Sequence, residues 1–315
     1  MPVNNSLVTQ QQAENNLPFS TVINSVPYQK MISNALKDRS TANRFISSIV
    51  SAVATTPALQ TCTPKTIVSA ALLGEALKLS PSPQLGQFYL VPFKQKEKRD
   101  KNNRVIAEAC TNATFVLGYK GYIQLATRSG EYKHINAMPI KEGELVDYNP
   151  FDDDITLQYT DNEELRATLP TIGYYAMFEY HNGFKKVMYW SKEKMIAHAA
   201  AYSPAFSAEG LKALESGKVP QSELWKYSSF WYKDFDGMAC KTMLRQLISK
   251  WGLMSVEMQK AFDADGGIIG DNGEITFSDS ERETEQQPQQ PDNIIDAEVV
   301  TEPEAEESFA DMLGG

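Results

Sequence analysis

Acidic side chains occur twice at spacings that could hold a divalent cation. The first group is Asp152–Asp154, and the second is the pair Asp234 and Asp236. Carboxylate oxygens suit Mg²⁺, and a metal-dependent nuclease would use them. Such a nuclease also needs further spaced carboxylates and a lysine, and the sequence has no such set. We interpret the first group as an acidic surface loop and the second as exposed helix positions, with the nuclease as an alternative.

Other residue types that could support catalysis lack the spacing it requires. The three histidines are scattered and form no HExxH pair. The chain has no GxxxxGKS/T loop, no GxGxxG after a predicted strand and no nucleophile elbow. Its three cysteines are far apart, so no disulfide framework or paired zinc motif is predicted, and a reducing cytoplasm is expected. We therefore expect no enzyme activity, no metal and no cofactor.

Basic residues interleaved with aromatic ones mark the segment 94–133. It has nine Lys or Arg and four Asp or Glu, a net charge of +5, with Tyr119, Tyr122 and Tyr132 among them. Proteins that bind single strands place cations along the phosphates and stack bases on aromatic rings. The segment therefore favours nucleic-acid binding, although most of the 14 Tyr and 14 Phe must belong to the core.

A second basic stripe is predicted on a long helix over residues 223–250, which Gly252 ends. At helical periodicity Lys226, Lys233, Lys241 and Arg245 fall toward one face, and apolar residues fill the other. The alternative is a solvated face without a ligand. Two basic elements in a chain without catalytic motifs favour a nucleic-acid partner.

Charge divides the chain into two parts. Residues 255–315 carry 17 acidic and 2 basic residues, a net charge of −15. The total of 30 basic and 40 acidic residues leaves 28 and 23 for residues 1–254, a net charge of +5. A basic body with an acidic tail predicts a polyanion partner or a regulatory tail, and a purely solubilising tail is the alternative.

The elements that must position these residues alternate in type along the chain. Residues 1–18 are rich in Asn and Gln and are predicted to form a disordered arm. Helices are expected at 44–55 and 63–80, and strands at 86–94 and 105–119 form a hairpin with a long basic tip. A short helix then ends at Gly130, and four strands follow at 132–144, 155–159, 171–180 and 185–190. Asn182-Gly183 joins the last two strands as a hairpin turn, and another helix begins after Ser191.

Periodicity is lost after about residue 263, and the remaining sequence is acidic and rich in Gln and Pro. We therefore predict a disordered arm at 1–18, a DNA-binding and oligomerisation core at 19–262 and a disordered acidic tail at 263–315. The tail could mimic DNA on the basic core, or its apolar end at Phe309, Met312 and Leu313 could be a docking peptide. No apolar run is long enough for a spanning helix, and the polar N-terminus argues against secretion.

The chain resembles the RecT family of phage and prophage recombinases over roughly residues 25–262. The resemblance lies in PQLGQFYLVPF, in GYKGYIQLATRSGEY, in the GFKKVMYW hairpin and in FWYKDFDGMACKTMLRQLISKWG, which follow one another in the family's order. It implies an α+β fold in which a β-hairpin and a small antiparallel sheet are crossed by helices, as in lambda Red beta. The acidic tail lies outside the resemblance.

The resemblance also implies a function. Family members anneal complementary single strands without ATP, invade duplexes in some conditions, and form rings or helical filaments on DNA. They act with a phage exonuclease that exposes the strand, and we also expect a host single-strand-binding protein as a partner and no membrane. A protective single-strand-binding protein without annealing activity is the alternative.

The resemblance also implies site residues at the positions where this sequence matches the family's motifs. Lys120 and Arg128 match the basic positions of GYKG and RSG, and the K-T-x-x-R pattern contributes Lys241, Thr242 and Arg245. In the family these segments line a narrow positive groove on the oligomer. With the basic and aromatic residues above, the predicted DNA-binding set is Lys94, Lys96, Lys98, Arg104, Tyr119, Lys120, Tyr122, Arg128, Lys133, Lys233, Lys241, Thr242 and Arg245.

Overall fold

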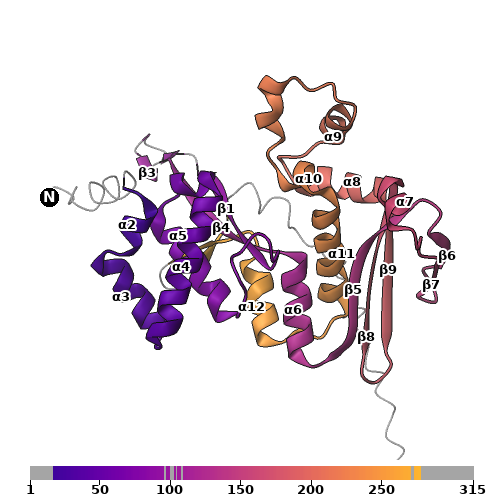
Figure 1. Ribbon diagram of the computed structural model, residues 1–315, viewed down its shortest axis with the longest axis horizontal. Helices are drawn as coiled ribbons and strands as arrows, with labels where there is room; N and C mark the ends of the chain where they lie inside the picture. Colours follow the sequence, from indigo (N-terminus) through magenta and orange to yellow (C-terminus); the bar gives the residue numbers. More distant parts are fainter. Residues whose placement is uncertain are drawn as a thin grey trace, which may run out of the picture.

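The computed structural model describes residues 17–95, 97–99, 103, 105–107, 109–270 and 273–277. Most of the predicted N-terminal arm, and the predicted tail beyond residue 277, lie outside the described residues. Figure 1 shows an elongated molecule, with the first helices at one end of its long axis and the pair β6 and β7 at the other. The mixed helices and small antiparallel sheets confirm the predicted α+β class.

The first part of the chain is helical. It contains α2 (Phe19–Ile23), α3 (Val26–Ala35), α4 (Arg39–Thr55), the 3-10 helix η1 (Pro57–Thr61) and α5 (Pro64–Ala76). The Asp38 carboxylate caps α4 by accepting the N–H of Thr41 at 2.7 Å. Pro64 opens α5 at a first-turn position, where its missing N–H costs no hydrogen bond. Both predicted helices of this region are thus present.

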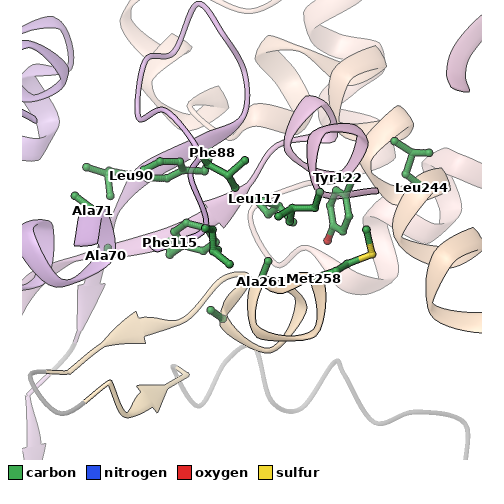
Figure 2. Close-up of a cluster of buried hydrophobic side chains, with 14 of the residues drawn as sticks. Ala70, Ala71, Phe88, Leu90, Phe115, Leu117, Tyr122, Leu244, Met258 and Ala261 are labelled. Carbon is green, nitrogen blue, oxygen red and sulfur yellow. The ribbon is translucent and has the colours of Figure 1, made fainter. Parts of the chain in front are cut away.

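The predicted hairpin follows α5. Strand β1 (Phe88–Gln95) pairs antiparallel with β4 (Cys110–Leu117), and the short strands β2 (Lys98–Arg99) and β3 (Val105–Ala107) pair toward the tip. Apolar alternation puts Phe88 and Phe115 on the inner face, where their rings stack with centroids 5.0 Å apart. Figure 2 shows these two rings with Ala70 and Ala71 of α5 on one side and Ala261 and Met258, from a later helix, on the other.

A three-stranded antiparallel sheet forms the other half of the core. It consists of β5 (Tyr132–Lys141), β8 (Thr171–Tyr180) and β9 (Lys185–Ser191) in the order β5-β8-β9, and α6 (Tyr119–Ser129) leads into it. Gly130 (φ 77°) ends α6, and Gly183 (φ 86°) turns the predicted β8–β9 hairpin. A separate pair, β6 (Leu145–Asn149) and β7 (Asp154–Leu157), precedes α7 (Glu163–Thr168).

The single helix predicted over 223–250 is wrong. The chain forms α8 (Lys192–Tyr202), α9 (Ala208–Glu215), the 3-10 helix η2 (Gln221–Tyr227), α10 (Phe230–Lys233) and α11 (Phe235–Trp251). Asp234 is extended (φ −148°, ψ 72°), and its carboxylate caps α11 by accepting the N–H of Gly237 at 2.9 Å. Because Lys226 and Lys233 lie on other elements, the predicted four-residue basic stripe does not form one helix face.

The fold also continues past the predicted boundary at residue 262. That boundary falls inside α12 (Val256–Ala264), which is followed by β10 (Ile268–Ile269) and β11 (Ile275–Thr276). The N–H of Phe115 donates to the carbonyl of Gly267 at 2.9 Å, and Asp265 and Ile269 are buried. A short segment that adds to the edge of β4 has no helical or strand periodicity, and the sequence pattern therefore missed it.

Helix α11 joins the two halves of the core. It packs against α6, β5 and β8, and Figure 1 shows it running between α6 and the three-stranded sheet. Its buried residues include Met243, Leu244, Leu247 and Ile248. None of the helices in the described part of the chain has the length and apolar character that a membrane span requires.

Candidate nucleic-acid interface

Two glycines bring the first turn of α6 directly against the loop that precedes β1. The N–H of Gly118 donates to the carbonyl of Gln87 at 2.9 Å. A Cβ at Gly121 would overlap that same carbonyl oxygen, and a Cβ at Gly118 would overlap the carbonyl oxygen of Gly86. The glycines of the GYKGY segment therefore serve close packing, which places Tyr119 and Lys120 beside β1.

Four side chains gather where α6 begins, and we call Tyr89, Tyr119, Lys120 and Phe230 the junction cluster. The rings of Tyr89 and Phe230 lie 5.5 Å apart with an interplanar angle of 42°, and 38% of Phe230 is exposed. Lys120 is exposed, and its Nζ lies 5.9 Å from the ring centroid of Tyr119. Partly exposed rings beside an exposed cation are the combination that binds bases and phosphates of a single strand.

Apolar and charged groups both border the junction cluster. An apolar hollow of about 100 Å³ lies between Tyr89, Phe230 and the end of α4. Lys233, exposed on α10, adds a cation, whereas Asp234 adds a negative charge. Burial raises the pKa of both Tyr89 and Tyr119, and the Asp234 carboxylate raises it further. Both tyrosines are therefore neutral phenols at physiological pH.

Lys241 and Arg245 are held by a buried carboxylate, and we call Tyr122, Lys241, Arg245 and Asp265 the Asp265 cluster. Lys241 Nζ lies 2.9 Å from Asp265 Oδ1, and Arg245 Nη1 lies 2.8 Å from Oδ2. The backbone N–H of Leu117 also donates to Oδ1, at 2.9 Å. The Lys241 side chain is 13% exposed and that of Arg245 29%.

Opposing effects set the charge of Asp265. Burial alone would raise its pKa, but Lys241, Arg245 and the hydrogen bond from Leu117 outweigh it and hold the pKa below the ordinary value. Asp265 is therefore ionised, and two cations against one carboxylate leave the cluster a net charge of +1. Arg245 carries the more accessible share of that charge.

The prediction that Tyr122 stacks on bases is wrong. Its side chain is fully buried, its hydroxyl donates to Asp265 Oδ2 at 3.1 Å, and its ring contacts Phe262 edge-on at 4.9 Å. Figure 2 shows the ring among Leu117, Leu244 and Met258. Position on the helix decides this outcome, since Tyr122 lies on the buried face of α6 together with Leu125 and Ala126, three and four residues further along.

Arg128 and Lys133 already have partners. The Arg128 guanidinium donates to the carbonyls of Leu77 and Lys78, at 2.7 and 3.3 Å, and so caps the C-terminal end of α5. Lys133 Nζ lies 2.6 Å from a carboxylate oxygen of Glu179 on the neighbouring strand. Both side chains remain exposed, Arg128 in the last turn of α6 and Lys133 near the start of β5.

The remaining predicted site residues lie apart from these clusters. Lys94 is exposed near the end of β1, on the alternate face from Tyr89. Thr242 is half-buried on α11. Lys96 and Arg104 lie outside the described residues, and for Lys98 only the backbone is described. The structure thus brings Tyr119 and Lys120 together in the junction cluster and Tyr122, Lys241 and Arg245 together in the Asp265 cluster. Lys233 lies on the same element as Phe230, and the other predicted site residues lie apart.

Three residues of these clusters were missed in the sequence. Tyr89 alternates with the core residues Phe88 and Leu90, so its outward position was readable, but nothing marked it as a partner of Phe230. Phe230 lies 141 positions after Tyr89 in the sequence, so their contact is seen only in the folded structure. Asp265 gave no signal, because it is one of several acidic residues in a segment that looked like the start of the acidic tail.

Each of the two acidic groups singled out in the sequence has a member that contacts another residue of the chain. Asp153 pairs with Lys186 at 2.8 Å at the exposed β6–β7 turn, which confirms the surface-loop interpretation. Asp236 accepts the hydroxyl of Tyr174 at 2.7 Å and is half-buried, so its interpretation as an exposed helix position is wrong. No group of three or more His, Cys, Asp or Glu that could hold a metal ion occurs within the described ranges.

Comparison with known proteins gives a family. The sequence matches the RecT family over residues 43–287. It is 37% identical over 220 residues to the uncharacterized protein YqaK of Bacillus subtilis, covering 70% of this chain and 63% of YqaK. It is 26% identical over 254 residues to the protein RecT of Escherichia coli, covering 80% of this chain and 82% of that protein. The family match runs from within α4 through β11 and includes both clusters.

Proposed function

Since the chain belongs to the RecT family, we propose that it binds single-stranded DNA as an oligomer and pairs complementary strands without ATP, in phage homologous recombination. The observation that carries the proposal is the junction cluster, where an exposed lysine adjoins partly exposed aromatic rings. Its partners are then a single strand, the annealed duplex intermediate, further copies of the chain, a phage exonuclease and a host single-strand-binding protein.

The strand would lie across the junction cluster with its phosphates toward the cations. Lys120 and Lys233 are exposed and can contact phosphates without reading sequence. Phe230 and Tyr89 offer partly exposed rings on whose faces any base can stack, at about 1–3 kcal/mol per base. Because stacking uses the face of a base, the Watson–Crick edges of the bound strand stay free to pair with a complementary strand, which annealing requires.

Other predicted site residues have secondary parts in this proposal. The predicted residues Lys94, Lys96, Lys98 and Arg104 would contact the strand beyond the junction cluster. Arg245, whose side chain is 29% exposed, would face a phosphate with its exposed part. Arg128 and Lys133 would add only long-range attraction, because each is engaged within the chain. Lys241 and Thr242 then position the surface instead of contacting DNA.

The energetics need no nucleotide cofactor. Base pairing is downhill, so the protein has only to neutralise phosphate repulsion and hold strands in register. Each copy would cover a few nucleotides, and an array of copies turns modest contacts into tight binding that weakens as salt rises.

Two complementary oligonucleotides, labelled as a fluorescence-transfer pair and added one after the other without nucleotide or metal, test the proposal. An annealing protein speeds pairing and stays on the product. A protein that binds the first strand but slows pairing is the protective binder, which is the alternative function. Loss of full-length strands on adding Mg²⁺ would instead indicate a nuclease and would contradict the proposal.

A further inference from the structure

The apolar hollow beside the junction cluster is large enough to hold a side chain. Its volume is about 100 Å³, and its lining includes Leu59, Pro81, Pro83, Tyr89, Leu90 and Phe230. Pro83 is exposed and Phe230 is 38% exposed, so the hollow opens to solvent. A cavity of about 150 Å³ with apolar walls holds a benzene molecule. The hollow therefore has room for one apolar side chain that enters from outside.

Two cations stand beside the hollow. Lys120 and Lys233 are exposed, and within the described part of the chain neither pairs with a carboxylate. Lys120 lies over the loop that leads into β1, since a Cβ at Gly86 would be 3.4 Å from its Cδ. Lys233 follows Phe230 by three residues on α10. An open apolar hollow beside such cations is complementary to a peptide with apolar and acidic side chains.

The acidic tail contains a segment of this kind. Residues 278–315 have 12 acidic residues and one basic residue, a net charge of −11. Within them, residues 301–313 (TEPEAEESFADML) carry five carboxylates and no basic residue. The same segment contains Phe309, Met312 and Leu313, and Phe309 is the single aromatic residue of 278–315. The sequence of this segment therefore matches the hollow and its cations.

The tail also begins close to the hollow. Leu90 pairs with Phe115 across the hairpin, and the N–H of Phe115 donates to the carbonyl of Gly267 at 2.9 Å on the other side of β4. Two strand spacings of about 4.8 Å put Gly267 roughly 10 Å from Leu90. Phe277 lies beside Gly267, because a Cβ there would be 3.4 Å from its ring. The 32 positions from Phe277 to Phe309 can span about 105 Å, far more than this distance.

We propose that residues 301–313 bind the junction cluster of their own chain when no DNA is present. One apolar side chain of the segment enters the hollow, and its carboxylates face Lys120 and Lys233. The proposal rests on the function proposed above, because a single strand uses the same cations and rings. Segment and strand therefore exclude each other, and the strand must displace the segment to bind.

The tether sets the size of the effect. A flexible connection of this kind gives an effective concentration of about 1 mM. A segment that binds on its own with a Kd of about 0.1–0.5 mM then occupies most copies and weakens binding of a short strand by about three- to elevenfold. Because the contact joins exposed opposite charges, the effect shrinks as salt rises.

Fluorescence anisotropy with a short oligothymidylate at low salt tests the competition in the full chain. The apolar variant combines Phe309→Ala, Met312→Ala and Leu313→Ala, and its control combines Ile294→Ala, Ile295→Ala and Val299→Ala. The acidic variant combines Glu302→Gln, Glu304→Gln and Glu306→Gln, and its control combines Glu281→Gln, Glu283→Gln and Glu285→Gln. Both test variants should bind the strand about three- to elevenfold more tightly than wild type, and both controls should resemble wild type.

Photocrosslinking locates the contact directly. The full chain with p-benzoylphenylalanine at position 309 is irradiated without DNA, and mass spectrometry maps the products. Crosslinks are expected on residues 81–90 or on Phe230, and oligothymidylate should abolish them. The same probe at position 294 is the control and should not reach the hollow. Mixing with an isotopically heavy chain that lacks the probe separates crosslinks within one chain from crosslinks between copies.

Three results would each overturn the proposal. Crosslinks from position 309 that are absent, fall away from the hollow, or occur only on a second copy would remove the contact within one chain. Wild-type strand affinity of both test variants would remove the competition. An equal gain for the acidic variant and its charge-matched control would reduce the tail to a diffuse electrostatic effect.

Failure of this contact can be told apart from failure of the proposed function, because the crosslink is read without DNA. A chain that crosslinks at the hollow but neither binds nor anneals strands would refute the function and leave the contact standing. A chain that anneals strands while position 309 crosslinks elsewhere would refute the contact and leave the function standing.

Discussion

Replacing Asp265 with asparagine should destabilise the protein severely with almost no change in side-chain volume. The aspartate accepts four hydrogen bonds, two of them from cations that are 13% and 29% exposed. Removing its charge takes from Lys241 the buried carboxylate with which it pairs and from Arg245 one of the groups that it contacts. Breaking a buried ion pair from one side costs about 3–5 kcal/mol, a large share of a typical stability of roughly 5–15 kcal/mol.

Urea denaturation at pH 7, followed by tryptophan fluorescence, measures this loss. Asp263→Asn is the matched control, since Asp263 is exposed two positions earlier, and it should change the free energy of unfolding by less than about 0.5 kcal/mol. Adding Lys241→Met to Asp265→Asn should recover part of the loss, because one unpaired cation is then gone. Asp265→Asn as stable as wild type would refute the structural role of the cluster.

The pH dependence of the same variant gives an independent check. Because the pKa of Asp265 is lowered in the folded protein, its ionised form stabilises the fold. This contribution is complete above the ordinary carboxyl pKa and is lost as the pH falls through the lower folded-state value. The stability difference between wild type and Asp265→Asn should therefore be constant near neutral pH and shrink in acid.

Three further predictions follow from other contacts. Lys120→Ala should weaken binding to all single strands and lower the slope of log K against log salt by about 0.7, measured by fluorescence anisotropy; an unchanged slope would exclude Lys120 from the interface. Gly121→Ala should lower the free energy of unfolding by about 1–3 kcal/mol, because its methyl group meets the backbone of Gln87, and wild-type thermal stability would contradict this packing. For Glu144, burial raises the pKa, but Arg166 and the backbone N–H groups of Lys141 and Thr160 together outweigh burial and lower the pKa to about 2. Stability should therefore fall from pH 4.5 toward 2, and Arg166→Met should make that dependence shallower in acid titrations.

Local sequence patterns predicted the elements that are held together by local rules. The hairpin of β1 and β4 follows from alternation, the end of α6 from Gly130, and the β8–β9 turn from Asn182-Gly183. The family resemblance indicated Lys120, and the basic segment with interleaved aromatic residues indicated Tyr119. The structure gives the glycines around them a packing role.

Patterns failed where a single residue or a distant contact decides the structure. Asp234 interrupts a helical run because its carboxylate caps the next helix, and helix periodicity does not register such an interruption. Tyr122 and Asp265 are 143 positions apart, and neither residue type indicates that they meet in the core. Lys241 was likewise predicted to be a surface cation, but it pairs with the buried carboxylate of Asp265.

The most direct measurement of the central claim is the annealing rate of a variant that combines Lys120→Ala with Phe230→Ala. Both side chains are exposed at the junction cluster, and Lys212→Ala with Leu224→Ala, also exposed, is the matched control. The account predicts that the junction variant remains folded, loses most of its acceleration of pairing and binds single strands weakly, whereas the control resembles wild type. A junction variant that anneals at the wild-type rate would contradict the account.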